Sequence, residues 1–133
     1  MKLLLDTHAF LWFISGDSQL SGYARQLIED AGNQRYLSIV SVWEITIKSS
    51  LGRLEVPTPP SRLMSEYIWA NAIELLTITS EHLDVVHKLP YHHNDPFDRL
   101  MIAQAIHEDM TLISRDVALN AYSVRIEWTD RKE

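Results

Sequence analysis

Short apolar runs recur along the chain, and longer segments with helical spacing separate them. Residues 2–5 form an apolar run that ends at Asp6, and residues 36–40 combine aromatic, aliphatic and β-branched side chains. Continuous apolar runs of this length are typical of strands buried on both faces of a parallel sheet. The pattern predicts strands at residues 2–5, 36–40, 75–78, 111–114 and 124–128.

Helices are predicted between these strands. Residues 21–31 have apolar side chains spaced along one helical face. Ser41 is a candidate N-cap for a helix over 42–51, which Gly52 ends. Pro96 is tolerated at the first position of a helix over 96–109. Further helices are predicted at 8–14, 61–72 and 80–87, and the proline-rich residues 56–60 are predicted to form a loop.

The alternation of strands and helices predicts an α/β fold with a parallel sheet and helices on both faces. A length of 133 residues fits one domain of the usual size, about 100–150 residues. The sequence shows no internal repeat, and the proline-rich segment is too short to link two domains. We therefore expect a single domain over residues 1–133.

Composition limits the chemistry and the compartment. The net charge is −6, from 12 basic and 18 acidic residues, so charge alone gives no argument for nucleic-acid binding. The chain has no cysteine, which excludes disulfides, thiolate zinc sites and cysteine nucleophiles. No segment resembles an export signal or a membrane span, so a cytoplasmic location is expected.

Four acidic residues stand in apolar surroundings at positions where a parallel sheet collects its ligands. Asp6 follows the first strand directly, and Asp116 follows the fourth by two residues. Glu44 and Asp98 interrupt strongly apolar helices. Ligands of open α/β sheets bind beyond the carboxyl ends of the strands, so these side chains are candidates for one shared site.

Each acid also has a purely structural interpretation. Asp6 and Asp116 are suitable N-caps for the segments that follow them. Glu44 has Lys48 four residues later, the favourable orientation for an ion pair on a helix. Asp98 lies in the first helical turn after Asp95, where a carboxylate suits the helix dipole.

Taken together, the four acids indicate a metal site. Carboxylates that converge in a cleft repel one another, and buried charges need a partner or a metal. Oxygen-rich sites of this kind suit Mg²⁺ or Mn²⁺. Such an ion can activate water, stabilise charge on a phosphodiester and attract a polyanion to an acidic protein.

Five segments of the chain form a recognisable set of motifs: LLLDTH at 3–8, SVWEI at 41–45, LGRL at 51–54, HNDPFDRLMIAQA at 93–105 and LISRD at 112–116. These motifs resemble those of PIN-domain ribonucleases, most closely the VapC-type toxins of bacterial toxin–antitoxin pairs. The Asp-Pro-Phe-Asp-Arg block with its apolar continuation is the most specific of them, and the motifs keep the family's order over nearly the whole chain.

The resemblance implies a three-layer α/β/α fold with strand order 3-2-1-4-5 and a metal-dependent endoribonuclease. A water activated by the metal would attack the phosphorus and leave 5′-phosphate and 3′-hydroxyl ends. Asp6, Glu44 and Asp98 would hold Mg²⁺, or alternatively Mn²⁺, and Asp116 would be the fourth acid. The resemblance places Thr7 and Ser114 in supporting positions beside the acids. Asp95 is better explained as the N-cap of the following helix than as a metal ligand.

The resemblance also implies partners: an RNA substrate, a small antitoxin protein and a second copy in a homodimer. The candidate RNA contacts are the basic residues nearest the acids, namely Lys48, Arg53, Arg99 and Arg115. Structural roles are an alternative for these, since Lys48 can pair with Glu44 and Arg99 can orient Asp98 or Asp95.

Two other functions are compatible with parts of this pattern. A magnesium-dependent phosphatase of the haloacid-dehalogenase type also begins with a strand that ends in aspartate, but His8 stands where such an enzyme needs its second acid. A non-catalytic scaffold of PIN-like fold has no evident need to keep four repelling carboxylates. His92 and His93 raise the question of zinc, but the ligand spacing is incomplete and the segment is predicted to be a turn.

Overall fold

The first strand supplies side chains to two separate cores. In the computed structural model, which describes residues 1–129, strand β1 is Lys2–Leu5. Leu3 and Leu5 pack into one hydrophobic cluster and Leu4 packs into the other, since successive side chains of a strand point to opposite faces. All three leucines are fully buried, so β1 lies in the middle of the molecule.

Five parallel strands form the sheet, in the order β3-β2-β1-β4-β5. In the register, Leu5 lies beside Leu37 on one side and beside Ile113 on the other. The carboxyl ends of the three central strands therefore meet at one edge. The remaining strands are β2 (Gln34–Ser38), β3 (Ile73–Leu76), β4 (Thr111–Ile113) and β5 (Ile126–Glu127).

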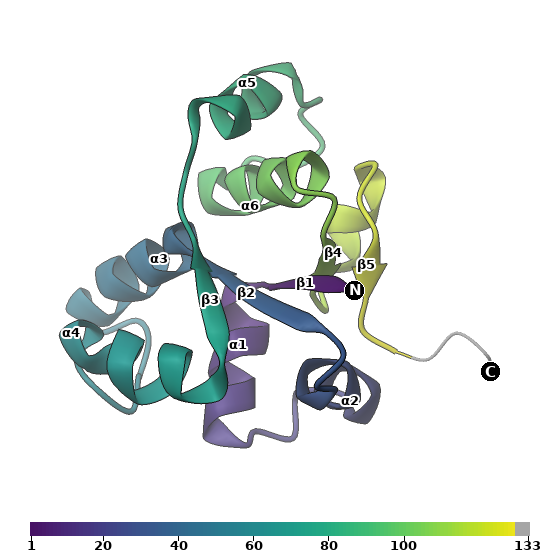
Figure 1. Cartoon of the computed structure of the whole chain (residues 1–133). Helices are drawn as coiled ribbons and strands as arrows, with labels where there is room; N and C mark the ends of the chain where they lie inside the picture. The colour runs from purple at the N-terminus through teal and green to yellow at the C-terminus, as the bar shows by residue number, and fades with distance from the viewer. Residues whose placement is uncertain (130–133) are drawn as a thin grey trace.

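Helices cover both faces of this sheet (Figure 1). On one face, α1 (Thr7–Ser15) and α2 (Gly22–Glu29) pack against β1. On the other lies α6 (Pro96–His107), with α5 (Ser80–Lys88) packed against it. Helix α3 (Ile39–Ser50) contributes Ile45 to the first core and Val40 to the second. The predicted parallel α/β sheet, its strand order and its two helical layers are confirmed.

The predicted boundary between the second strand and the following helix is wrong. Strand β2 ends at Ser38 and α3 begins at Ile39, so Ser38 is the N-cap and Ser41 lies buried inside the helix. The Ser38 hydroxyl accepts from the Val40 amide at 3.0 Å and donates to Gln104 Oε1 at 2.5 Å. Gln104 lies 66 positions away in the chain, so the local pattern could not identify this cap.

The segment predicted as one helix over 61–72 is instead three short helices. They are α4 (Pro60–Leu63), a π-helical turn η1 (Met64–Ile68) and a 3₁₀ turn η2 (Trp69–Asn71). Leu63 and Ile68 are both buried although they are five residues apart, a spacing that a π turn brings onto one side. The hydrophobic core therefore decides the helix type here.

The remaining elements follow the predicted pattern with shifted ends. The third strand lies two residues earlier than predicted and the fifth is shorter, because hydrogen bonds to β2 and β4 decide their extent. A 3₁₀ helix, η3 (Val117–Ala121), follows β4, with Asp116 as its N-cap. No helix within residues 1–129 is long and apolar enough to cross a membrane.

A candidate metal centre at the carboxyl ends of the strands

Asp6 lies where β1 leaves the sheet and α1 begins. Its amide donates to the carbonyl of Ile113 at 3.1 Å, which ties it to the end of β4. Its carboxylate accepts from the Ala9 amide at 2.7 Å, so Asp6 is the predicted N-cap of α1. The Ser114 side chain also hydrogen-bonds to this carboxylate. Asp6 thus combines the capping role with a place in the site.

Glu44 lies on α3 and is 5% exposed. Its Oε1 accepts from the Thr7 hydroxyl at 2.6 Å, and its Oε2 accepts from Lys48 Nζ at 2.5 Å. The hydrogen bond with Glu44 raises the pKa of Lys48. The predicted ion pair along the helix is therefore present, and Thr7 supports Glu44 instead of its neighbour Asp6.

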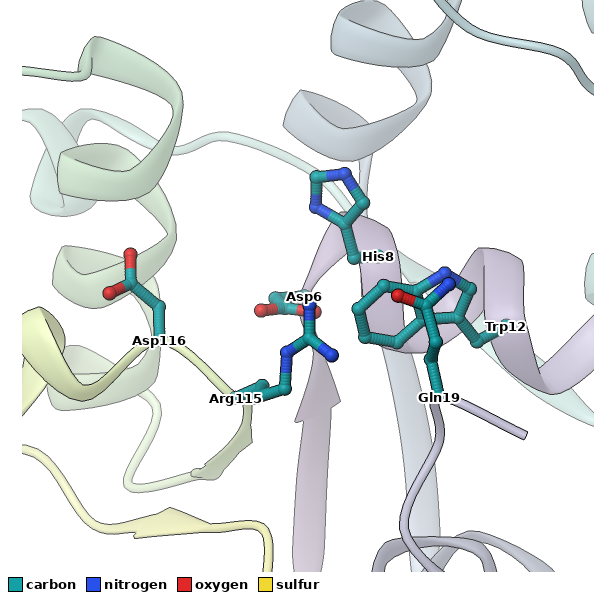
Figure 2. Close-up of a pocket in the computed structure, with 6 residues that line it drawn as sticks. All are labelled: Asp6, His8, Trp12, Gln19, Arg115 and Asp116. Atoms are coloured by element: carbon teal, nitrogen blue, oxygen red, sulfur yellow. The ribbon is translucent and has the colours of Figure 1, made fainter. Parts of the chain in front are cut away.

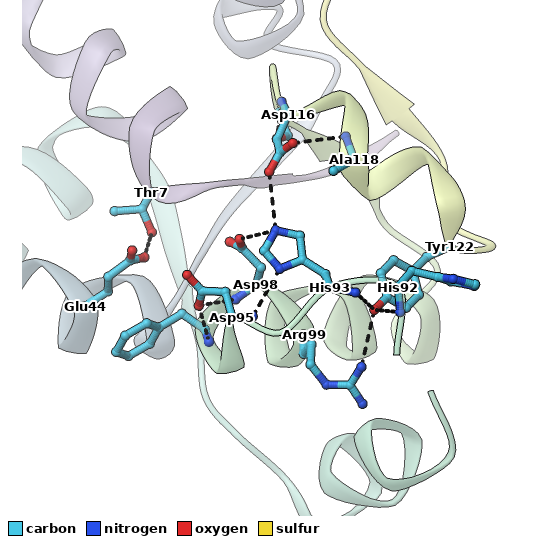
Figure 3. A network of polar contacts seen from close by, with 12 residues as sticks. Thr7, Glu44, His92, His93, Asp95, Asp98, Arg99, Asp116, Ala118 and Tyr122 are labelled. Carbon is cyan, nitrogen blue, oxygen red and sulfur yellow. Dashed lines mark hydrogen bonds and ion pairs between the residues drawn. The ribbon is translucent and has the colours of Figure 1, made fainter. Parts of the chain in front are cut away.

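Asp98 and Asp116 approach each other around His93 (Figure 3). His93 Nε2 lies 3.4 Å from Asp98 Oδ2 and 3.6 Å from Asp116 Oδ2. One potential ligand atom of each of these three residues lies within 4.8 Å of the others. Asp95 caps α6 as predicted, since its Oδ1 accepts from the amides of Phe97 and Asp98.

The hydrogen bonds of His93 define which of its nitrogens carries the proton. Nδ1 accepts from the Asp95 amide at 3.1 Å, so the proton of a neutral ring is on Nε2 and points toward Asp98 and Asp116. A metal bound at Nε2 would require a proton at Nδ1, where the amide already donates. His93 is therefore arranged to donate to the two carboxylates and not to ligate an ion.

Two carboxylates of this site, Asp98 and Asp6, resist ionisation, and burial is the largest cause. Burial, followed by the charge of Asp95, raises the pKa of Asp98 to about 7, with smaller contributions from Glu44 and Asp6. His93 opposes this rise. Burial also raises the pKa of Asp6, which the hydrogen bond from Ser114 opposes. The charge in this cleft is only partly compensated by the side chains around it.

All four predicted acids line one cleft: Asp6, Glu44, Asp98 and Asp116. Thr7, His8, Lys48, Asp95 and Leu119 complete its lining. The donor set consists of carboxylate oxygens, the ligands that Mg²⁺ and Mn²⁺ prefer. Burial, and after it the repulsion between the acids, raises the pKa values of Asp98 and Asp6. A divalent cation would compensate this partly buried negative charge, so the residues fit such an ion.

The four candidate RNA contacts occupy different environments. Lys48 is paired with Glu44, and Arg53 lies exposed beyond α3, outside the lining of the cleft. Arg115 lies in a second cleft of about 500 Å³, which shares Asp6 and Asp116 with the first (Figure 2). There its guanidinium lies 4.5 Å from the centre of the Trp12 ring.

Arg99 is unsuitable as an RNA contact. It is 5% exposed, and its guanidinium donates to the carbonyls of Val86, Leu89 and Pro90 and to the Tyr122 hydroxyl. These bonds tie α6 to the end of α5 and to the segment after it, so the idea that Arg99 orients Asp98 or Asp95 is also incorrect. The side chain is part of the scaffold.

Two histidines, His8 and His93, lie in the site although the sequence patterns predict no role there for either. His93 was considered only for zinc, and its neighbour His92 instead packs against Tyr122. The position of His93 shortly before α6 indicates proximity to Asp98. Its approach to Asp116 has no signal in the local sequence. His8 lines both clefts, and its signal was its place two residues after Asp6.

A family model described as "PIN domain" matches residues 3–124. No curated protein matches the sequence. Several solved structures match by fold. A chain of VapBC2 from Rickettsia felis, bound to a DNA fragment from the promoter, has a TM-score of 0.71 and 15% identity, over 97% of this chain and 100% of that one.

Two further structures have the same fold. A toxin–antitoxin complex from Klebsiella pneumoniae contains a chain with a TM-score of 0.62 and 16% identity, over 94% of this chain and 95% of that one. A chain of VapBC-1 from nontypeable Haemophilus influenzae has a TM-score of 0.62 and 13% identity, over 96% of this chain and 97% of that one. Identities this low show a shared fold, and the assemblies named are those of the matched proteins.

Proposed function

Because this chain belongs to the PIN domain family, whose model matches residues 3–124, we propose that it is a metal-dependent endoribonuclease. The observation that carries the proposal is the convergence of four carboxylates in one cleft. They come from the end of β1, from α3, from the start of α6 and from the segment after β4. A scaffold without catalytic function would gain no stability from placing these charges together.

In this proposal Asp6, Glu44, Asp98 and Asp116 hold Mg²⁺, with Mn²⁺ as the alternative. When bound, the ion supplies Lewis acidity toward water and the phosphodiester and neutralises charge in the transition state. Ser114 orients Asp6 through its hydroxyl, and Thr7 orients Glu44 at 2.6 Å. Both carboxylates thus approach the cleft in fixed positions, as a preorganised site requires.

The protein side chains also determine where charge is placed around the substrate. Lys48 Nζ lies on the Glu44 side of the cleft, and the Nε2 proton of His93 lies on the Asp98 and Asp116 side. When a cation takes over the compensation of the acids, both groups become available to donate to phosphate oxygens. Such contacts position RNA without selecting its sequence.

We assign the chain to the toxin component of a toxin–antitoxin pair. Support comes from structural relatives that are parts of VapBC assemblies and of a toxin–antitoxin complex. A small antitoxin would cover the acidic cleft, where a basic side chain finds complementary charge. A homodimer is part of the same assignment.

Cleavage of total cellular RNA by the antitoxin-free protein tests the enzymatic proposal. We expect cutting in Mg²⁺, none in EDTA, and a fall of at least about 100-fold for Asp6→Asn and Asp98→Asn, since each removes a charged metal ligand. Asp84→Asn is the matched control, because Asp84 is exposed on α5 and outside the cleft. Its activity should equal that of the wild type.

Three results would overturn the proposal. Folded, metal-saturated wild-type protein that binds RNA but cuts none would be a binding scaffold. Hydrolysis of a phosphate monoester, with RNA left intact, would indicate a phosphatase. Cutting that survives both substitutions would show that these acids do not carry the reaction.

A further inference from the structure

Two clefts are lined by both Asp6 and Asp116, and the larger of them has other side chains in its walls than the candidate metal centre. It measures about 500 Å³ and is lined by Asp6, His8, Trp12, Gln19, Arg115 and Asp116 (Figure 2). This volume is within the range of small-ligand sites, about 300–1,000 Å³. The acids lie at one end, and an aromatic and a basic side chain lie beside them.

The aromatic wall of this cleft is held in place from two sides. His8 and Trp12 lie one helical turn apart on α1, with ring centroids 5.5 Å apart. Trp128 packs edge-on against Trp12 at 6.0 Å. Trp12 is partly buried against the core and is held there by Trp128, while His8 is exposed beside it.

Arg115 is a cation without a carboxylate partner in the part of the chain that the structure describes. It directly precedes Asp116, yet its guanidinium stacks on Trp12 instead of forming a salt bridge. Lys48, on the other side of the acids, is paired with Glu44. A stacked guanidinium offers a planar, positively charged surface on which a base can stack, and its donors can reach a phosphate.

Gln19 adds a group that can distinguish one base from another. Its side chain is exposed and lines the cleft, and its amide nitrogen donates to Asp17 Oδ2 at 3.4 Å. An amide offers both a donor and an acceptor, as a base edge does. Stacking surfaces tolerate any base, so selectivity in this cleft would come from Gln19.

We infer that this cleft binds the base of an RNA nucleotide next to the scissile phosphate. The inference rests on the proposed nuclease function, since the acids shared by the two clefts define where that phosphate lies. The base stacks on the wall formed by His8, Trp12 and Arg115, and its edge meets Gln19. The cleft therefore contributes to the choice of cleavage site, a role that the four acids cannot perform.

Binding of single nucleotides tests the cleft without relying on catalysis. The probes are the four 5′-nucleoside monophosphates, and inorganic phosphate serves as the comparison that lacks a base. Amide and indole signals are followed by ¹⁵N NMR, with the Trp12 signal assigned through Trp12→Phe. We expect at least one nucleotide to shift the Trp12 indole and Gln19 side-chain signals saturably, and phosphate alone to leave them in place.

The variants separate this cleft from general charge effects. Arg115→Gln and Gln19→Ala should each weaken the binding of the preferred nucleotide by about fivefold or more. Arg25→Gln is the matched control, because that guanidinium also lies over an aromatic ring, Phe13 at 5.6 Å, but outside the cleft. Its nucleotide affinity should equal that of the wild type.

Cleavage of an RNA pool with random sequence provides the second readout. Wild-type protein should show a base preference beside the cut, which Gln19→Ala flattens while cutting continues. Shifts caused equally by phosphate, shifts that persist in Arg115→Gln, or shifts that follow protein concentration alone would overturn the inference. The last result would assign the cleft to a second copy of the chain.

The two proposals can fail separately. Protein that cuts RNA but neither binds nucleotides nor changes its preference in the variants would refute the base site and keep the nuclease. Protein that binds nucleotides through Trp12 and Arg115 but cuts no RNA would refute the nuclease, and with it the placement of the base beside a scissile bond.

Discussion

At the scale of single residues, Asp98 shows that a predicted metal ligand lowers the stability of the metal-free fold when it is ionised. Its carboxylate is 24% exposed, and Asp95, Glu44 and Asp6 surround it with like charge. Ionisation therefore costs free energy in the folded chain, and its pKa rises to about 7. The nearby Nε2 proton of His93 relieves only part of this cost.

The raised pKa of Asp98 predicts a pH-dependent stability for the metal-free protein. In the unfolded chain the carboxylate ionises near its ordinary pKa of 3.8, whereas in the folded chain it stays protonated up to about 7. The unfolded state thus binds fewer protons over this interval, and stability falls as pH rises through it. Above about pH 7 the protonated Asp98 no longer contributes to the free energy of unfolding.

Denaturant titrations in EDTA at pH 5 and pH 8 measure this effect. Asp98→Asn, which carries no charge, should be more stable than the wild type by about 1–2 kcal/mol at pH 8 after allowance for solvent screening, and by less at pH 5. Asp84→Asn again serves as the control. Equal stabilities of wild type and Asp98→Asn at pH 8 would contradict the prediction.

At the scale of elements, the junction between β2 and α3 positions Glu44. Ser38 ends the strand, caps the helix and bonds to Gln104 on α6. Glu44 is the sixth residue of α3, in the second turn after this cap, and its carboxylate accepts from the Thr7 hydroxyl at 2.6 Å. The cap thus fixes the start of this helix, which carries a predicted ligand, to its neighbour α6.

A comparison of two serines tests this assignment. Ser38→Ala removes the cap and leaves the buried Gln104 Oε1 without the hydroxyl that donates to it, and should lower the free energy of unfolding by about 1–3 kcal/mol. Ser41→Ala loses only contacts with the Thr7 hydroxyl and the Met101 sulfur, at 3.0 and 3.3 Å, and should cost less. Urea unfolding of both variants gives the order, and a larger loss for Ser41→Ala would favour the cap that the sequence suggested.

At the scale of the whole molecule, four segments that are distant in sequence share one cleft because the sheet is parallel. The central strands end at one edge, and each acid follows such an end or lies on the helix beside it. Bringing these charges together lowers the stability of the folded chain. An ion that binds only the folded chain would raise the free energy of unfolding again through linkage.

This coupling predicts that Mg²⁺ stabilises the folded protein. Thermal unfolding at pH 8 should shift upward steadily as Mg²⁺ is raised above its dissociation constant, with about 2.7 kcal/mol gained at 100 times that value. Asp98→Asn should show little shift, since it lacks a ligand. Sodium chloride at equal ionic strength is the control for screening, and an equal shift with this salt would exclude a specific site.

Much of this molecule was predictable from local patterns, for identifiable reasons. The apolar run before Asp6 predicted the central strand, and Asp95-Pro96 predicted the start of α6, since both signals lie within a few residues. The four acids were recognised as one candidate site because strand ends in a parallel sheet converge. Their metal-binding role stays a prediction.

Other features were decided only in three dimensions, because their partners are remote in sequence. Gln104 selects Ser38 as the cap, and the core imposes a π turn between Leu63 and Ile68. His93 meets Asp116, and Arg115 stacks on Trp12, across contacts that no local spacing encodes. The sequence by itself determined which groups are available and roughly where each strand ends. The tertiary structure decided which of them are paired, which are buried and which line each cleft, because these depend on distances between segments.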